Sequence, residues 1–436
     1  MRLHPRLGLL ADHGYRQLFA STTVSQFGFH LTLLGLPLVA IVTLTASPFE
    51  VGLLAAVEMA PFLLIGLPAG AWVDRMRRRL VLIVGDLARG AILVTVPLAW
   101  WAGVLTIWQL YAVAFGFGVF TVFFDVAYQS YLPHLVGREN LVEGNAKLES
   151  VRAVAQLGGP ALAGQLIRLL SAPVALLVNG VVMAASAGFV VRIRKREDKP
   201  ARQPDARLVR EIMEGLRFVL GHRLLRAIAT CTASFNLLSS AYAPMLLLYL
   251  QRDLGQDAGT IGLVLTVWGA GGLVGAAVAR RFAGWVGQGP AIWLSVALTA
   301  PFALLMPVLA AAGWRLWVAA AGGFILSIGV VVYNVTQVSF RQAVTSDQLL
   351  GRMNATIRFL VFGTMPLGGL LGGVLGQTLG VRTALLIAAL GQCVAFLPVF
   401  LSPLRRMRIL PTEPDPALAP AAGPGHHGRY DSQPAP

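Results

Sequence analysis

The sequence predicts an all-α membrane protein whose twelve transmembrane helices form two pseudo-symmetric halves of six. Three observations support this fold class. Hydrophobic residues make up 56% of the 436 residues and charged residues only 13%, whereas a soluble domain carries roughly 25% charged residues. Apolar runs of about 20 residues, the length that crosses a hydrocarbon core of roughly 30 Å, recur along the chain. One long polar stretch, residues 193–223, divides these runs into two equal sets.

Each expected span is a long apolar run that a polar or charged segment ends. The first half is expected to cross the membrane at residues 17–45, 51–73, 80–101, 107–131, 146–169 and 172–192. The second half is expected to cross at residues 224–250, 259–281, 289–312, 316–340, 356–378 and 381–402. The domains are then an N-terminal half at 1–192, a cytoplasmic linker at 193–223, a C-terminal half at 224–402 and a tail at 403–436.

The linker is expected to contain an amphipathic helix, and the tail is expected to be disordered. The linker positions Leu208, Ile212, Leu216 and Val219 recur at helical spacing opposite charged residues, as in an amphipathic helix on a membrane surface. A solvated linker helix is the alternative interpretation. The tail after Pro403 is rich in proline and alanine, so we expect it to be disordered in the cytoplasm.

The net charge of +15 raises the question of a nucleic-acid partner, because basic patches are the footprint of phosphate binding. The placement of the basic residues argues for topology instead. Nearly all arginines and lysines fall on one side of the twelve-span arrangement, and Arg168, Arg252, Arg315 and Arg382 fall on the other. Since these residues accumulate in cytoplasmic loops, both termini and the linker are expected inside a bacterial inner membrane, in contact with anionic lipid.

A compact basic loop follows the second expected span. The stretch from Gly70 to Arg79 holds one aspartate and four arginines between two apolar runs. It resembles the loop between helices 2 and 3 of the major facilitator superfamily of transporters, although Arg77 stands where that family usually has a second glycine. Asp74 can cap a neighbouring helix N-terminus, and Arg78 can meet Asp125. We therefore expect a conformational latch made of Gly70, Asp74, Arg75, Arg78 and Asp125.

A second motif lies in the fifth expected span. Gly159, Pro160 and Gly164 resemble the antiporter motif of exporters in the same superfamily, with one glycine replaced by alanine. Proline removes a helix hydrogen bond and kinks the span. The motif favours export, although kinked helices occur in membrane proteins of either transport direction. Residues 25–28 and 351–360 resemble the branch that contains enterobactin exporters and macrolide efflux pumps.

Two ionisable residues lie inside expected spans, where a charge is costly and suggests a function. Glu58 is the first candidate for a proton-coupling group, and His30 is the second because histidine titrates near physiological pH. A structural hydrogen bond is the alternative for each. Further polar residues would be costly against lipid and are therefore candidates for the substrate cavity: Gln26, Asn236, Tyr242, Asn334 and Gln337.

The predicted function is secondary active transport. The chain carries no nucleophile-elbow, phosphate-loop or His-Glu-x-x-His motif and no metal-ligand spacing, so we expect no enzyme, no cofactor and no metal. We expect a monomer that exports small amphipathic or apolar compounds, drug-like, macrolide-like or siderophore-like, in exchange for protons. Its partners are then the substrate, protons and membrane lipid, with no nucleic acid. The alternatives are an uptake permease of the same fold and a non-transporting membrane sensor or scaffold.

Overall fold

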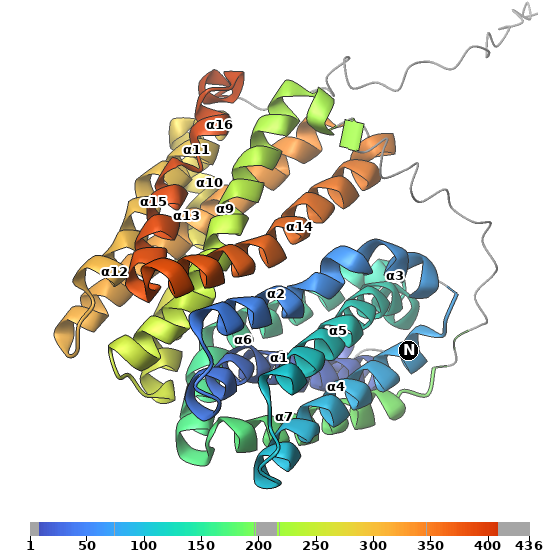
Figure 1. Cartoon of the computed structure of the whole chain (residues 1–436). Coiled ribbons are helices and arrows are strands. Elements are labelled where there is room, and N and C mark those ends of the chain that lie inside the picture. Colours follow the sequence, from blue (N-terminus) through green and yellow to red (C-terminus); the bar gives the residue numbers. More distant parts are fainter. Residues whose placement is uncertain are drawn as a thin grey trace, which may run out of the picture.

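The computed structural model describes residues 8–73, 75–195, 197, 216–217, 219–345 and 347–408. All regular structure in this part of the chain is helical, which confirms the predicted all-α fold. Figure 1 shows the helices gathered into an N-terminal set, coloured blue to green, and a C-terminal set, coloured from the lime green of α9 to red. Asp74, most of the expected linker helix and the tail after residue 408 lie outside the described residues.

The N-terminal set follows the first six expected spans in order. Its helices are α1 (His13–Leu38, continued by the π-helical turn η2, Val39–Thr43), α2 (Pro48–Leu64), α3 (Gly66–Val73), α4 (Arg78–Trp101), α5 (Ile107–Val136), α6 (Leu141–Leu170) and α7 (Ala172–Val191). Asp12 caps α1 by accepting a hydrogen bond from the Tyr15 backbone N–H over 2.8 Å, and Ser47 and Glu50 form a capping box on α2. These side chains satisfy backbone groups that a helix start leaves unpaired, so they define where the spans begin.

The C-terminal set follows the second six. Its helices are α9 (Arg223–Leu248, continued by the π-helical turn η4, Tyr249–Asp253), α10 (Ala258–Val286), α11 (Gln288–Thr299, continued by η5, Ala300–Leu304, and α12, Leu305–Leu309), α13 (Trp314–Val344), α14 (Asp347–Leu379), α15 (Val381–Val394) and α16 (Leu397–Phe400). Val219, which was expected on a surface helix, is fully buried and belongs to the same hydrophobic core as Leu225 of α9.

Ten helical segments of the described chain are long and apolar enough to cross a membrane. The two other expected spans, 51–73 and 146–169, coincide with α2–α3 and with α6. α2 has 17 residues and stops at Ile65, which separates it from α3. α6 carries charged residues, including Arg152 and Arg168, that lower its mean hydropathy. The arrangement is therefore compatible with twelve crossings, of which one is interrupted and one is more polar than the rest.

The two sets repeat one architecture. Each first helix ends in a π-helical turn, and each second helix has an N-terminal cap, Ser47 in one set and Asp257 in the other. Residues with positive φ recur at matching connections: Thr45 with Gly255, Gly103 with Gly313, and Ser171 with Gly380. Since few residues tolerate positive φ, their recurrence in the same connections is evidence for an internal repeat, the usual construction of a secondary transporter.

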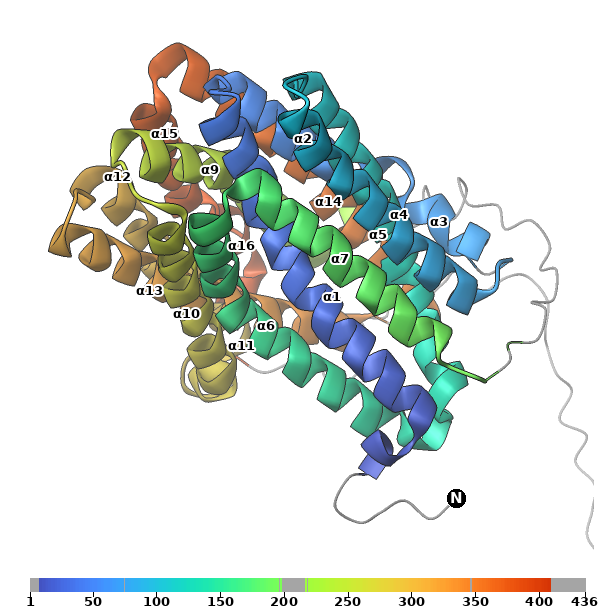
Figure 2. The same ribbon diagram turned by 90° about the horizontal axis from the view of Figure 1, so that it is seen from below.

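The two sets meet most closely at the end of the molecule that carries the loops after η2 and η4, which we call the hairpin end. A Cβ added at Gly52 of α2 would lie 2.5 Å from the Gly373 Cα of α14, and one at Gly262 of α10 would lie 3.0 Å from the Gly164 Cα of α6. Small residues allow helices to approach this closely. Figure 2 shows α6 beside α10, and in Figure 1 the two sets diverge toward the opposite, terminal end, where α1 begins.

Candidate functional site

A cavity with two adjoining parts lies between the two sets of helices. The apolar pocket has a volume of about 370 Å³ and the polar pocket a volume of about 710 Å³. Both are lined by residues of α1, α6, α9, α10 and α13, and the apolar pocket also reaches α2 and α15. The two pockets share His30, Leu33, Pro160, Ser239 and Trp268. A transporter that alternates its access requires a central site at such an interface.

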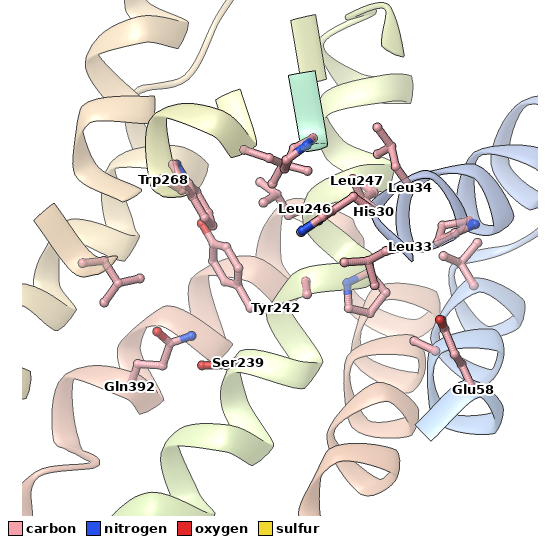
Figure 3. Close-up of a pocket in the computed structure, with 18 residues that line it drawn as sticks. His30, Leu33, Leu34, Glu58, Ser239, Tyr242, Leu246, Leu247, Trp268 and Gln392 are labelled. Carbon is pink, nitrogen blue, oxygen red and sulfur yellow. The ribbon is translucent and has the colours of Figure 1, made fainter. Parts of the chain in front are cut away.

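The apolar pocket is formed mainly by leucine, proline and aromatic side chains (Figure 3). Tyr242 is buried, and its hydroxyl donates a hydrogen bond to the Ala303 carbonyl oxygen over 3.1 Å. Its ring centroid lies 6.4 Å from that of Trp268. Because the Tyr242 hydroxyl is already paired, this side chain offers the pocket mainly its aromatic ring.

Glu58 lies in the wall of the apolar pocket, on α2. Its side chain is 6% exposed, and no hydrogen bond or ion pair to its carboxyl exists within the described chain. Close packing of α2 on α5 holds its backbone, since a Cβ added at Gly118 would lie 2.6 Å from the Glu58 carbonyl oxygen. A lone carboxyl among apolar side chains is a group that can take up a proton when the cavity admits one.

His30 of α1 lies against the antiporter-like motif of α6. A Cβ added at Gly159 would lie 2.7 Å from the His30 Cγ, so the absence of a side chain at Gly159 makes room for the imidazole. The ring also makes an edge contact with Phe29, with centroids 5.9 Å apart. Pro160 lines both pockets, while Gly164 packs on α10. The motif therefore shapes the cavity wall in addition to the helix interface.

The other cavity candidates divide between the pockets. Asn236, Asn334 and Gln337 line the polar pocket, and Asn236 donates its side-chain amide to the Thr232 carbonyl oxygen over 2.8 Å. Gln26 is half-buried on α1 and lines neither pocket. Three of the five residues thus share one wall that only the tertiary arrangement of α9 and α13 creates.

The structure brings two of the expected latch residues together. Asp125 shares a pocket of about 260 Å³ with Gly70 and with Arg358, which belongs to α14 of the other set. Arg75 is exposed beside α3, and Asp74 lies outside the described residues. The coupling of Arg78 to Asp125 stays a prediction. The cations that the fold brings near Asp125 are Arg89, Arg152 and Arg358.

A polar network inside the N-terminal set was only partly foreseen. Asp86 and Arg89 stand three residues apart on α4, a spacing that predicts an ion pair on one helix face, and the structure shows them paired and buried. The Ser186 hydroxyl of α7 donates to the second Asp86 carboxylate oxygen over 2.7 Å, and the Arg89 guanidinium lies 4.2 Å from the Phe124 ring centroid. Helical spacing predicted the pair, but the partners on α5 and α7 follow from packing alone.

Arg89→Ala is expected to destabilise the protein by about 3–5 kcal/mol, because it leaves the buried Asp86 carboxylate without its counter-charge. Thermal unfolding of the purified variant in detergent measures this loss. Arg152→Ala is the matched control: Arg152 pairs with Glu149, but the two side chains are 49% and 64% exposed, so its loss should cost less than about 1 kcal/mol. Equal effects of the two changes would contradict the structural role of the buried pair.

Sequence reasoning missed Arg341 of α13, which is 6% exposed and lines the polar pocket. It was counted among the basic residues that mark the cytoplasmic side of the membrane, because it directly follows the expected span 316–340. Its spacing contained a signal, since it stands one helical turn after Gln337, a residue already assigned to the cavity. Arg358, near the start of the expected span 356–378, was also not assigned to the cavity.

The repeated helical architecture and the cavity between its halves define a multi-pass membrane transporter, and not an enzyme. The chain matches the family model described as transmembrane secretion effector over residues 6–420. It therefore belongs to that family of the major facilitator superfamily, which confirms the resemblance seen in the sequence.

Named relatives and solved structures agree with this assignment. The chain is 23% identical over 372 residues to macrolide efflux protein A of Streptococcus pyogenes, covering 83% of this chain and 90% of the relative. It is 27% identical over 385 residues to the multidrug efflux pump Tap of Mycobacterium tuberculosis, covering 84% and 88%. The nucleoside transporter NupG superposes with a TM-score of 0.72 at 12% identity, covering 89% and 98%, which shows a shared fold. A bacterial homologue of the lysosomal transporter Spinster, in an inward-facing and unoccupied conformation, superposes with a TM-score of 0.69 at 14% identity, covering 91% and 98%.

Proposed function

We propose that this protein exports small amphipathic or apolar compounds across the bacterial plasma membrane in exchange for protons. The observation that carries the proposal is Glu58, a carboxyl without a described partner in the apolar pocket between the two halves. The names of the relatives, a macrolide efflux protein and a multidrug efflux pump, support export as the direction. The leucine-rich lining of the apolar pocket supports cargo with a substantial apolar body.

Proton movement is coupled to transport because the protonated and the ionised forms of the Glu58 carboxyl are stable in different environments. An ionised Glu58 is costly among apolar side chains, so proton uptake favours an occluded pocket. Re-exposure to solvent allows the proton to leave. His30, on the same cavity wall, is the second candidate for this role and can relay a proton into the cavity. The conformation described, closed at the hairpin end, then corresponds to a state open to the cytoplasm.

This assignment requires the terminal end of the bundle to face the cytoplasm. We expect a cysteine at Val104, which is 64% exposed in the connection between α4 and α5, to react with an impermeant thiol reagent added outside intact cells. A cysteine at Val142, which is 84% exposed at the start of α6, should react only after the membrane is permeabilised. Both variants need a background without Cys231 and Cys393. The reverse labelling pattern would overturn the proposed topology.

The direct test of function is accumulation in an efflux-deficient bacterial host. Cells that express the protein should retain less of several antibiotics, dyes or siderophores than control cells, and an uncoupler should remove the difference. An uptake permease would raise accumulation under the same proton gradient. A sensor or scaffold would change neither accumulation nor susceptibility. Purified protein in proteoliposomes with an imposed proton gradient then separates direct transport from cellular effects.

A further inference from the structure

The polar pocket carries positive charge, and Asp125, the carboxyl that lies near Arg358, belongs to the neighbouring pocket. Among its described lining residues are two arginines, Arg341 of α13 and Arg358 of α14, and no aspartate or glutamate. Its other polar side chains are the titratable His30 and neutral groups such as Asn334 and Gln337. A cavity lined by one sign of charge with low-dielectric walls attracts the opposite sign.

Arg341 is the stronger candidate of the two arginines, because it is buried and two of its nitrogens lack a partner among the described residues. Its side chain is 6% exposed, and its Nε and Nη1 atoms have no hydrogen-bond acceptor within the described chain. Burying a guanidinium without an anion is costly, and each missing acceptor adds to that cost. Such a site is completed by an anion that enters the cavity.

We propose that Arg341, assisted by Arg358, binds the anionic headgroup of the exported compound while the apolar body of that compound occupies the apolar pocket. The two pockets share seven wall residues, including His30 and Trp268, so they form one continuous cavity. The planar guanidinium donates paired hydrogen bonds to carboxylate, sulfonate or phosphate groups. The substrate class is therefore amphipathic organic anions. This inference rests on the proposed function and names the cargo of the same cavity.

A lipid phosphate would offer Arg341 the same chemistry as a soluble anion. The apolar pocket favours the soluble compound, because the anion site belongs to the same cavity as a small hydrophobic space of about 370 Å³ between the two sets of helices. A membrane lipid with two long chains would have to leave the bilayer to fill it. The experiment below separates the two sources by changing the lipid composition.

The test uses the full chain in phosphatidylcholine nanodiscs and two fluorescent probes with the same rings. These are 8-anilinonaphthalene-1-sulfonate, which is anionic, and N-phenyl-1-naphthylamine, which lacks the sulfonate. Arg341→Gln should weaken binding of the anionic probe about tenfold or more and leave the neutral probe unchanged, because it removes a charged hydrogen-bond donor. Arg341→Lys should restore part of the loss. Arg315→Gln, at the exposed opposite end of α13, is the matched control and should change neither affinity.

Equal loss of both probes in Arg341→Gln, or no loss of the anionic probe, would overturn the proposal. So would displacement of the anionic probe from the wild-type protein by phosphatidylglycerol in the nanodiscs, since the site would then belong to lipid. If Arg341→Gln does not fold, Arg358→Gln should still weaken the anionic probe alone. Binding is measured without a gradient, so a protein that binds the anion but moves nothing uphill would refute the proposed export and leave the anion site standing.

Discussion

Glu58→Gln is expected to abolish uphill export while leaving substrate binding intact. The amide keeps the shape of the carboxyl in the apolar pocket but cannot bind and release a proton, so the cargo can no longer be driven against its gradient. In proteoliposomes with an imposed proton gradient, the variant should equilibrate cargo to a concentration ratio of about 1 at most, because downhill exchange needs no coupling. Proton release on adding cargo to the purified wild-type protein should vanish in the same variant.

The control is Glu149→Gln on α6, a carboxyl that is 64% exposed outside the cavity. It should pump as the wild type does. His30→Ala decides between the two coupling candidates: uphill export by Glu58→Gln together with failure of His30→Ala would move the role to His30. Uphill export by both variants would show that coupling lies elsewhere in the chain or uses another ion.

Gly52→Leu is expected to stop the transport cycle by preventing closure of the hairpin end. A Cβ at this position already lies 2.5 Å from the Gly373 Cα and 2.6 Å from the Gly369 carbonyl oxygen, so a leucine must push α2 away from α14. Overpacking of this kind costs about 1–3 kcal/mol, and the cost falls only on the conformation in which the two helices touch. Export should therefore fall by about tenfold or more, with the population shifted toward a state open at the hairpin end.

A cysteine at Ser239, which lines both pockets, reports that shift. On a background without the native cysteines, it should react faster with an impermeant reagent added outside when Gly52→Leu is present. Gly188→Leu on α7 is the matched control, since no heavy atom lies within 4 Å of an added Cβ there. Normal export by Gly52→Leu, or equal damage by Gly188→Leu, would contradict the proposed role of the glycine contact.

Most of the secondary structure follows from the sequence because of the membrane itself. Backbone groups in hydrocarbon must be paired within the segment, so a long apolar run becomes a helix. The expected span 80–101 coincides closely with α4, and the span 172–192 with α7. The prediction was less complete for α2, where Ile65 interrupts the helix, and for the first helix of each half, where a π-helical turn follows. Those features depend on local backbone geometry, to which hydropathy is insensitive.

The candidate site was predicted as a collection of residues, without its grouping. Cost against lipid singled out Glu58, His30 and Asn334, but that argument says only that a side chain avoids the bilayer. It does not say whether a residue meets a neighbouring helix or a cavity. Gln26 met the same criterion and lies outside both pockets. Arg341 was overlooked because an arginine at the end of a span ordinarily indicates topology.

The sequence by itself determined the class of protein, the approximate limits of most of its spans and the motifs that place it in its superfamily. These depend on composition and on spacing along one chain. Only the tertiary structure decided that Gly159 makes room for His30, that Glu58 has no partner among the described residues and that Arg341 shares a cavity with Arg358. These relations join helices far apart in the sequence, and the close packing of side chains that creates them leaves no periodic signal in any single segment.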